Sequence, residues 1–214
     1  MAKNNIPLAI GLNENQWSIY AKKSADPSFK AIKNQVWQRD HYTCQYCDFQ
    51  STRFMDVAHI DNDYQNVRLN NLITACPFCM QCHFLHMVGK SEKSGGKLIY
   101  LPKISQSQLN ALCHVLFCAI VNGTTYAQEA QNTINQLRLR SNKVEAVLGK
   151  GLSEPAMLGQ LLLDTPMKKD KTTIINATLK DLRLLPSKKK FERLVGQWSK
   201  EALTTNASKP AISG

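Results

Sequence analysis

The sequence predicts an α+β protein in which a cysteine-rich, metal-binding core is followed by a mostly helical half. Two Cys-x-x-Cys pairs and short candidate strands occupy the first hundred residues, whereas helical periodicity dominates from Ser105 onward. With 214 residues, 43% of them hydrophobic, the chain can bury a sizeable core. We expect a metal-binding core over residues 1–104, a helical and basic region over residues 105–204 packed on it, and a flexible tail over residues 205–214.

One helix and two short strands are expected in the N-terminal part. Residues 7–13, PLAIGLN, can form a strand, and so can residues 97–101, KLIYL, which follow a turn-forming segment. Residues 28–40 have helical spacing behind Ser28, a residue type that often caps helices. The apolar positions of this helix are Phe29, Ile32, Val36 and Trp37.

The C-terminal half reads as a series of helices. Ser107 can cap the first, which Asn122 and Gly123 can end, and the cysteines within it, Cys113 and Cys118, are expected to be small buried hydrophobes. Further helices are expected over the segments 124–140 and 141–151, and the second of them ends in a glycine stop.

The last part of the chain contains one ambiguous segment between two helices. Ser153 can cap a helix with Pro155 in its first turn. The β-branched run 172–175 fits either a strand or a helix. A final helix is expected from Ser187 to about Leu203, with an apolar face made of Phe191, Leu194, Val195 and Trp198.

Charge and hydropathy limit the classes of partner. The formal net charge is +11, and residues 165–214 alone hold 11 Lys or Arg against 4 Asp or Glu. Such an excess suits an acidic protein, an anionic membrane surface or nucleic acid, or it is a solvated helical face. No apolar run reaches the roughly 18 to 20 residues that span a bilayer, and the N-terminus has no secretory pattern. We therefore expect a cytoplasmic protein.

Seven cysteines in such a protein favour metal binding over disulfides. Cys44 and Cys47 form one pair, and Cys76 and Cys79 form a second pair after 28 intervening residues. A two-residue spacer lets both sulfurs of a pair face one ion, and four thiolates suit tetrahedral Zn²⁺. Cys82 forms an overlapping pair with Cys79, so the spacing alone leaves open whether Cys76 or Cys82 completes the site.

A segment within residues 36–87 reads VWQRDHYTCQYC…MDVAHIDNDYQNVRLNNLITACPFC. It resembles the HNH, or ββα-metal, endonuclease fold in its zinc-stapled, treble-clef-like form. In that family an Asn-Leu stands five positions before the third cysteine, which here leads from Asn71 to Cys76. The resemblance therefore implies one structural zinc and leaves Cys82 spare. Its implied ligands are Cys44, Cys47, Cys76 and Cys79.

The same resemblance implies that the catalytic site is degenerate. His59 stands where the family has the general base that activates water. Ala58 replaces the cation ligand before it, and Met80, whose thioether suits a hard cation poorly, replaces the histidine after Cys79. We expect no enzymatic activity. His59 and Asn71 are then vestigial: His59 is expected to hydrogen-bond a backbone carbonyl, and Asn71 to brace a loop.

Length and layout, a degenerate HNH core followed by a helical, basic half of about 110 residues, resemble the IcmJ/DotN family of the bacterial Dot/Icm type IVB secretion system. The resemblance implies a non-enzymatic adaptor or structural subunit of the coupling complex, cytoplasmic and associated with the inner-membrane complex. Its implied partners are a segment of the coupling ATPase and acidic adaptor proteins. We expect no small-molecule substrate, no nucleic-acid partner, and membrane contact only through the complex.

The residues themselves leave two other functions open. A divergent metal-dependent endonuclease would use His59 with His83 or His86, which we otherwise expect on the surface or between helices. A DNA-binding protein without cleavage would also suit the +11 charge. The sequence assigns no partner-binding residues. Aromatic residues that can serve as anchors, although we expect them in the core, are Trp198, Phe191, Tyr64 and Phe84.

Overall fold

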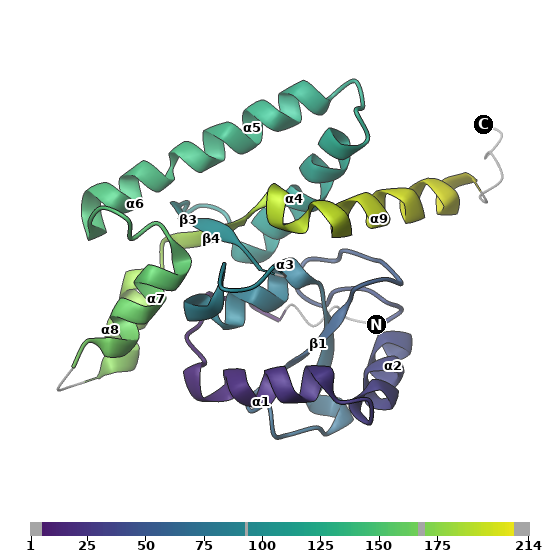
Figure 1. Cartoon of the computed structure of the whole chain (residues 1–214), viewed down its shortest axis with the longest axis horizontal. Helices are drawn as coiled ribbons and strands as arrows, with labels where there is room; N and C mark the ends of the chain where they lie inside the picture. The colour runs from purple at the N-terminus through teal and green to yellow at the C-terminus, as the bar shows by residue number, and fades with distance from the viewer. Residues whose placement is uncertain (1–5, 93, 167–169, 208–214) are drawn as a thin grey trace.

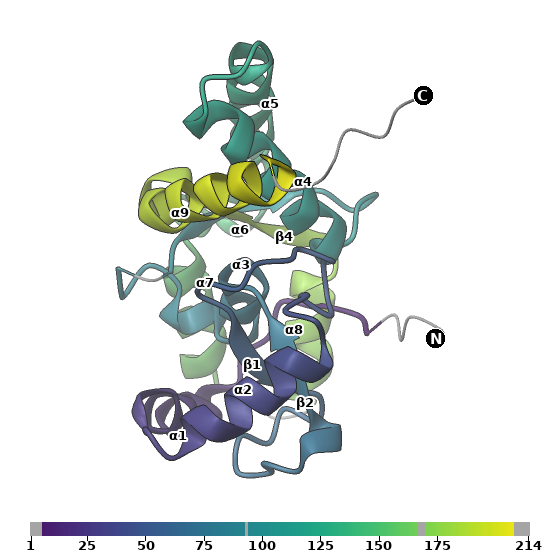
Figure 2. The same cartoon turned by 90° about the vertical axis from the view of Figure 1, so that its right-hand side faces the viewer.

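The computed structural model describes residues 6–92, 94–166 and 170–207, and it is a mixed α+β protein as predicted. Helices α1 (Glu14–Ala25) and α2 (Phe29–Arg39) lie on one side of the molecule. Helices α4 (Gln106–Val121) and α9 (Lys188–Ala207) lie on the other, with α3 (Pro77–Met80) between the two groups (Figures 1 and 2).

The N-terminal segment corrects one expectation. Residues 7–13 do not form a strand; Leu12 makes a single antiparallel bridge to Phe84. Next to it, the Gly11 N–H donates to the Cys82 carbonyl at 2.8 Å, and the Leu85 N–H donates to the Gly11 carbonyl at 3.0 Å. The segment pairs only with a short irregular stretch, so no ladder can extend from it. It nevertheless ties the N-terminus to the cysteine-rich region.

Helix α2 matches its predicted span, whereas its predicted cap does not form. Ser28 already has helical backbone angles and makes no side-chain cap bond. Its N–H instead donates to the Asp26 carboxylate at 2.8 Å. Helix α1 was not predicted, because it buries no residue completely and so carries a weak apolar stripe.

The first sheet is an antiparallel pair of β1 (Asp56–His59) and β2 (Leu72–Ala75), which ends directly before α3. The loop between the strands is braced by Asn71, as predicted. The Asn71 amide donates to the Asp61 carboxylate at 2.9 Å and to the Asn66 carbonyl at 3.0 Å, and its oxygen accepts the Asp61 N–H at 3.1 Å. Three short 3₁₀ turns complete this region: η1 (Leu69–Asn71), η2 (Gln81–His83) and η3 (Leu85–Met87).

The second sheet joins distant parts of the chain. Strand β3 (Gly96–Tyr100), which was predicted, pairs antiparallel with β4 (Leu182–Pro186), which was not. The ambiguous residues 172–175 are helical, within α8 (Lys171–Leu179), whose N-cap Asp170 accepts the Thr173 N–H at 3.2 Å. The β-branched run therefore lies in a helix, and the strand follows it.

The remaining helices match the predicted order with two changes at their starts. Ser105, not Ser107, caps α4 in a reciprocal capping box with Gln108. Glu154, not Ser153, precedes α7 (Pro155–Asp164). The other two helices are α5 (Ala127–Leu139) and α6 (Ser141–Leu148), and α6 ends at Gly149 with φ of 122° as predicted. Residues 205–207 continue α9, and residues 208–214 lie outside the described part of the chain.

The two halves share one hydrophobic core. The four candidate aromatic anchors are all buried, as is Cys113, whereas Cys118 is only partly buried. On α7, a side chain at Gly159 would come within 2.7 Å of the His86 backbone, so this helix packs tightly on η3. None of the described helices is long and apolar enough to cross a bilayer.

Candidate metal centre

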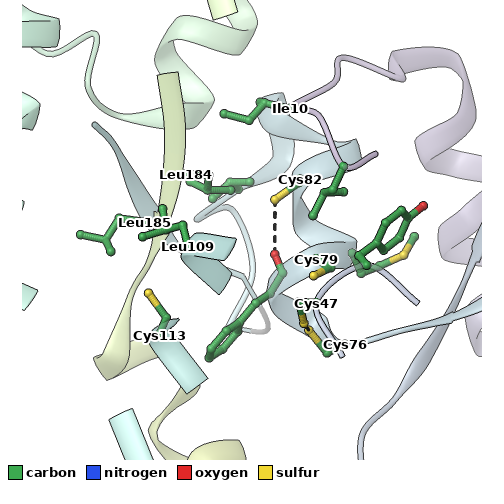
Figure 3. Close-up of a cluster of buried hydrophobic side chains, with 14 of the residues drawn as sticks. Ile10, Cys47, Cys76, Cys79, Cys82, Leu109, Cys113, Leu184 and Leu185 are labelled. Atoms are coloured by element: carbon green, nitrogen blue, oxygen red, sulfur yellow. Dashed lines mark hydrogen bonds between the residues drawn. The ribbon is translucent and has the colours of Figure 1, made fainter. Parts of the chain in front are cut away.

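Four cysteines converge in the interior, between the first sheet and α4. The Sγ atoms of Cys44, Cys47, Cys76 and Cys79 all lie within 4.8 Å of one another, and all four residues are buried. The Cys47 and Cys76 sulfurs are 3.6 Å apart. Figure 3 shows the sulfurs of Cys47, Cys76 and Cys79 grouped together, with Cys82 outside the group. We call these four residues the cysteine cluster.

The first pair is held by a tight turn. The Cys44 N–H donates to the Phe49 carbonyl at 2.8 Å, and the Asp48 N–H donates to the Cys44 carbonyl at 3.0 Å. Asp48 closes the turn with φ of 61°, a left-handed conformation that Asp tolerates better than most residues. The Gln45 N–H donates to the Thr74 carbonyl at 2.9 Å, which attaches the turn to β2.

The second pair is positioned by the junction of β2 and α3. Cys76 is the N-cap of α3 and Pro77 is its first residue, a position at which proline loses no hydrogen bond. The N–H groups of Cys79 and Met80 both donate to the Cys76 carbonyl, at 3.0 and 2.9 Å. This turn brings the two sulfurs to the same side.

The donor set fits a tetrahedral metal ion. Zinc–sulfur bonds of about 2.3 Å in a tetrahedron separate the sulfurs by about 3.8 Å, close to the observed Cys47–Cys76 separation. All seven cysteines are free thiols, so no disulfide accounts for the grouping. Cys82 has another role: its thiol donates to the Phe78 carbonyl at 3.3 Å, and burial raises its pKa to about 12. The cluster can hold a metal ion while Cys82 stays protonated.

The protonation of the cluster is uneven. Burial disfavours ionisation of Cys44, but hydrogen bonds from the thiols of Cys47, Cys76 and Cys79 outweigh it and lower the pKa of Cys44 well below its usual value. Burial raises the pKa of Cys76 and of Cys79. A metal ion must therefore displace protons from the cluster when it binds.

Two polar residues of α4 also reach the cluster, and sequence reasoning missed both. The Asn110 amide donates to the Cys79 sulfur at 3.2 Å. The His114 Nε2 lies 3.3 Å from the Cys76 sulfur. The available signal was a pair of polar residues four positions apart in the apolar part of the helix that follows its first turn, a spacing that places both on one helical face.

The three histidines considered for catalysis, His59, His83 and His86, are buried. His59 is 2% exposed, packs against the Tyr64 ring at 4.4 Å, and has no hydrogen-bond partner for either ring nitrogen among the described residues. The predicted bond to a carbonyl is therefore wrong. Burial, and then the nearby Lys23, lower the pKa of His59 to about 4. His83 and His86 are buried in η2 and η3 and not at the surface, which corrects the first of the two positions expected for them.

An apolar groove of about 750 Å³ opens on the side of α1. Phe54 lies on its rim, 38% exposed, and has φ of 59°, which is unusual for a bulky residue. The Arg193 guanidinium of α9 lies 6.0 Å from the Phe54 ring centre. Six residues represent the apolar lining: Trp17, Tyr20, Met80, Phe84, Met87 and Leu194.

The fold and the cluster define a mixed α+β protein with a buried four-cysteine cluster able to hold a metal ion. No family model matches the sequence. The chain is 45% identical over 196 residues to the type 4 apparatus protein DotN of Legionella pneumophila, and the match covers 92% of this chain and 91% of that protein. The chain belongs to the DotN (IcmJ) family of the Dot/Icm type IV secretion system, as the length and layout of its sequence predicted.

Proposed function

We propose that the protein is a non-enzymatic, zinc-containing structural or adaptor subunit of the type IV secretion coupling complex and that it binds a segment of the coupling ATPase. The 45% identity to an apparatus protein over 92% of the chain carries this proposal. The complex would hold the protein on the cytoplasmic side of the inner membrane. Its acidic adaptor proteins would be further partners, since the chain carries a net charge of +11.

Zinc is the proposed metal because of the donor set. Four thiolates in a tetrahedral, water-excluded site are typical of structural zinc, which has no redox chemistry and needs no open coordination position. All four cysteines of the cluster are buried, with at most 7% of any of them exposed. Bound there, the ion would tie the first turn, β2 and α3 to one point and supply stability that so small a sheet does not provide.

The absence of enzymatic activity is proposed from the residues around His59. The order β1, β2, α3 is that of an HNH-like ββα unit, and Ala58 and Met80 occupy the positions of the expected cation ligands. Ala58 is fully buried and Met80 is 4% exposed. Among the described residues, no group of three or more potential metal ligands other than the cysteine cluster occurs. His59 would therefore lack both a cation and access to water.

We assign the partner segment to the groove beside α1. The groove has an apolar lining, which favours a segment with apolar side chains. Lys33 on its wall is paired with Asp56 at 3.0 Å, so Arg193 beside Phe54 is the cation that the groove offers to an acidic side chain of that segment. Phe54 stands at the rim in a strained backbone conformation, and strain of this kind is often retained where it serves binding. An exposed aromatic beside an arginine is a typical anchor of such contacts.

Substitution of Phe54 by aspartate tests this assignment. Aspartate tolerates the positive φ at this position, so the fold should be retained while the aromatic anchor is lost and a charge is placed on the rim of an apolar groove. Tagged wild-type protein purified from its host should carry the coupling ATPase with it. With F54D we expect the affinity for that partner to fall by at least about 30-fold, the equivalent of a 2 kcal/mol anchor.

A matched control is Val147→Asp. Val147 lies on α6, away from the groove, and is 73% exposed, so this variant adds the same charge at a surface position. It should bind the ATPase like the wild type. Equal binding by F54D and V147D would contradict the groove assignment, and failure of the wild type to retain any secretion component would contradict the proposed function.

A nuclease assay tests the alternative that His59 and the +11 charge support. Purified protein with plasmid DNA and Mg²⁺, Mn²⁺ or Ni²⁺ should produce no cleavage, because His59 is sealed and its cation ligands are replaced. Cleavage that disappears in His59→Ala would establish an enzyme instead. DNA binding without cleavage would appear as an affinity that falls steeply with salt, and we expect no such binding.

A further inference from the structure

We propose that Asn110 and His114 of α4 are positioning residues of the metal centre, which donate hydrogen bonds to the thiolates of Cys79 and Cys76 and so make docking of the helical half depend on the metal. The inference rests on the proposed metal centre. It goes beyond that centre because it concerns residues outside the four ligands and a coupling between the two halves of the protein.

The two contacts have the geometry of hydrogen bonds between nitrogen and sulfur, and a metal-bound thiolate, which has no proton, can only accept in them. The Asn110 Nδ2 is 3.2 Å from the Cys79 sulfur, and the His114 Nε2 is 3.3 Å from the Cys76 sulfur. Asn110 is fully buried and His114 is 8% exposed, so neither sulfur contact competes with bulk water. Each contact goes to a different sulfur of the second pair, and both come from one face of one helix.

The orientation of Asn110 is set by a chain of bonds that begins in the second sheet. The Gln106 side chain accepts the Leu184 N–H at 2.8 Å and donates to the Leu184 carbonyl at 2.9 Å. Gln106 also donates to the Asn110 Oδ1 at 2.9 Å. Because the Asn110 oxygen is occupied in this way, its NH₂ group is the one that faces the Cys79 sulfur. Strand β4 is thus connected to the cluster through two side chains of α4.

The orientation of His114 is set by aromatic rings. Its imidazole lies parallel to the Phe49 ring at 3.7 Å and nearly parallel to the Phe78 ring at 4.2 Å, and the Trp198 ring meets it edge-on at 5.3 Å. Phe49 follows the first cysteine pair in the chain, and Phe78 lies inside the second. The imidazole therefore lies between one ring from the segment of each cysteine pair, and Trp198 of α9 covers it.

The physical need for these donors follows from charge. A divalent ion with four thiolates carries a net charge of −2, which is costly to bury in an apolar core. Hydrogen bonds from amide and imidazole N–H groups spread that charge and hold the sulfurs in place. Outer partners of this kind typically change metal affinity by 10- to 100-fold when they are removed. By linkage, a metal that binds more tightly when α4 is docked also favours docking of α4.

The test is the zinc affinity of His114→Phe and Asn110→Leu, measured by competition with a chelator on the full-length protein. H114F keeps a ring between Phe49 and Phe78 but cannot donate, and N110L keeps the approximate volume. We expect each variant to bind zinc 10- to 100-fold more weakly. With Co²⁺ in place of zinc, each variant should also shift the sulfur-to-cobalt charge-transfer band. His114→Gln, which restores a donor, should recover part of the affinity.

The control is Val115→Ala on the same helix, a position 67% exposed and outside the cluster. It should leave affinity and spectrum unchanged. Wild-type affinity and an unshifted cobalt band in both H114F and N110L would overturn the inference and leave the proposed metal centre intact. A wild-type protein that binds neither ion would overturn both. Since the two variants act on different sulfurs, each one tests a separate hydrogen bond.

Discussion

Replacement of Cys76 by serine is expected to abolish zinc binding and unfold the region built from β1, β2 and α3. A structural zinc contributes about 10 to 16 kcal/mol in small domains, which is as large as the net stability of a typical protein. Serine is a poor zinc ligand, and the three remaining thiols would not hold the ion. The buried serine hydroxyl would then be a polar group without a partner. Metal analysis should give about one zinc per wild-type chain and none for C76S, with loss of solubility or of the folded circular dichroism signal.

Cys82→Ser is the matched control for that experiment. The Cys82 thiol donates to the Phe78 carbonyl at 3.3 Å, a hydrogen bond that a serine hydroxyl can also make. C82S should therefore keep its zinc and lose only about 1 to 2 kcal/mol of stability through imperfect packing. Zinc loss in C82S together with zinc retention in C76S would show that the ligand set is wrong. Cys44→Ser should behave like C76S.

The second large effect is a loss of stability in mild acid. Burial lowers the pKa of His59 and of His83 to about 4, compared with about 6.5 for an exposed histidine. Between these values the unfolded chain binds more protons than the folded protein, so the stability is fully present above pH 6.5 and is lost as the pH falls toward 4. Each histidine contributes a slope of up to about 1.4 kcal/mol per pH unit, and the two together should cost about 4 kcal/mol between pH 6 and 4.

The charged groups around these histidines do not reverse the direction of this pH dependence. Lys23 further disfavours the charged form of His59, while the carboxylates of Asp61, Asp63 and Asp56 oppose burial without outweighing it. The pKa of His83 is lowered further by the nearby His59 and is raised by the nearby thiolate of Cys44, which does not outweigh burial.

Urea unfolding of the zinc-loaded protein at a series of pH values measures the slope, and His59→Phe isolates one histidine. Phenylalanine can pack against Phe29 and Tyr64, so the variant should fold while its slope falls by about 1.4 kcal/mol per pH unit. Proton competition at the cysteines acts on both proteins alike and cancels in the comparison. Identical slopes would mean that His59 is hydrated in the folded state.

Local patterns predicted much of this structure. The Cys-x-x-Cys spacing indicated a metal site because, in a protein expected to lack disulfides, two cysteines separated by two residues most often bind a metal ion. The end of α6 at a glycine was also predicted, because a helix often ends at a residue with positive φ, a conformation that glycine adopts readily. The loop brace at Asn71 was predicted too, because an asparagine between a strand and a turn readily bonds the neighbouring backbone.

The features that were missed depend on contacts between distant residues. Strand β4 is a short apolar run whose partner, β3, lies more than 80 residues earlier, and no local pattern records that pairing. His86 is buried against α7, and His83 lies beside the N-terminal segment at Gly11 and Asn13. His114 reads as an interruption of an apolar helix until the fold places it against a sulfur.

The β3–β4 pairing has a consequence for the order in which the newly made chain can assemble. All four cysteines of the cluster emerge long before residues 182–186, so an ion can be captured while the second sheet still lacks one strand. Trp198 emerges later still and covers the imidazole beside the sulfurs. Synthesis from the N-terminus thus leaves an interval in which the four sulfurs can meet an ion before Trp198 of α9 packs on the imidazole beside them.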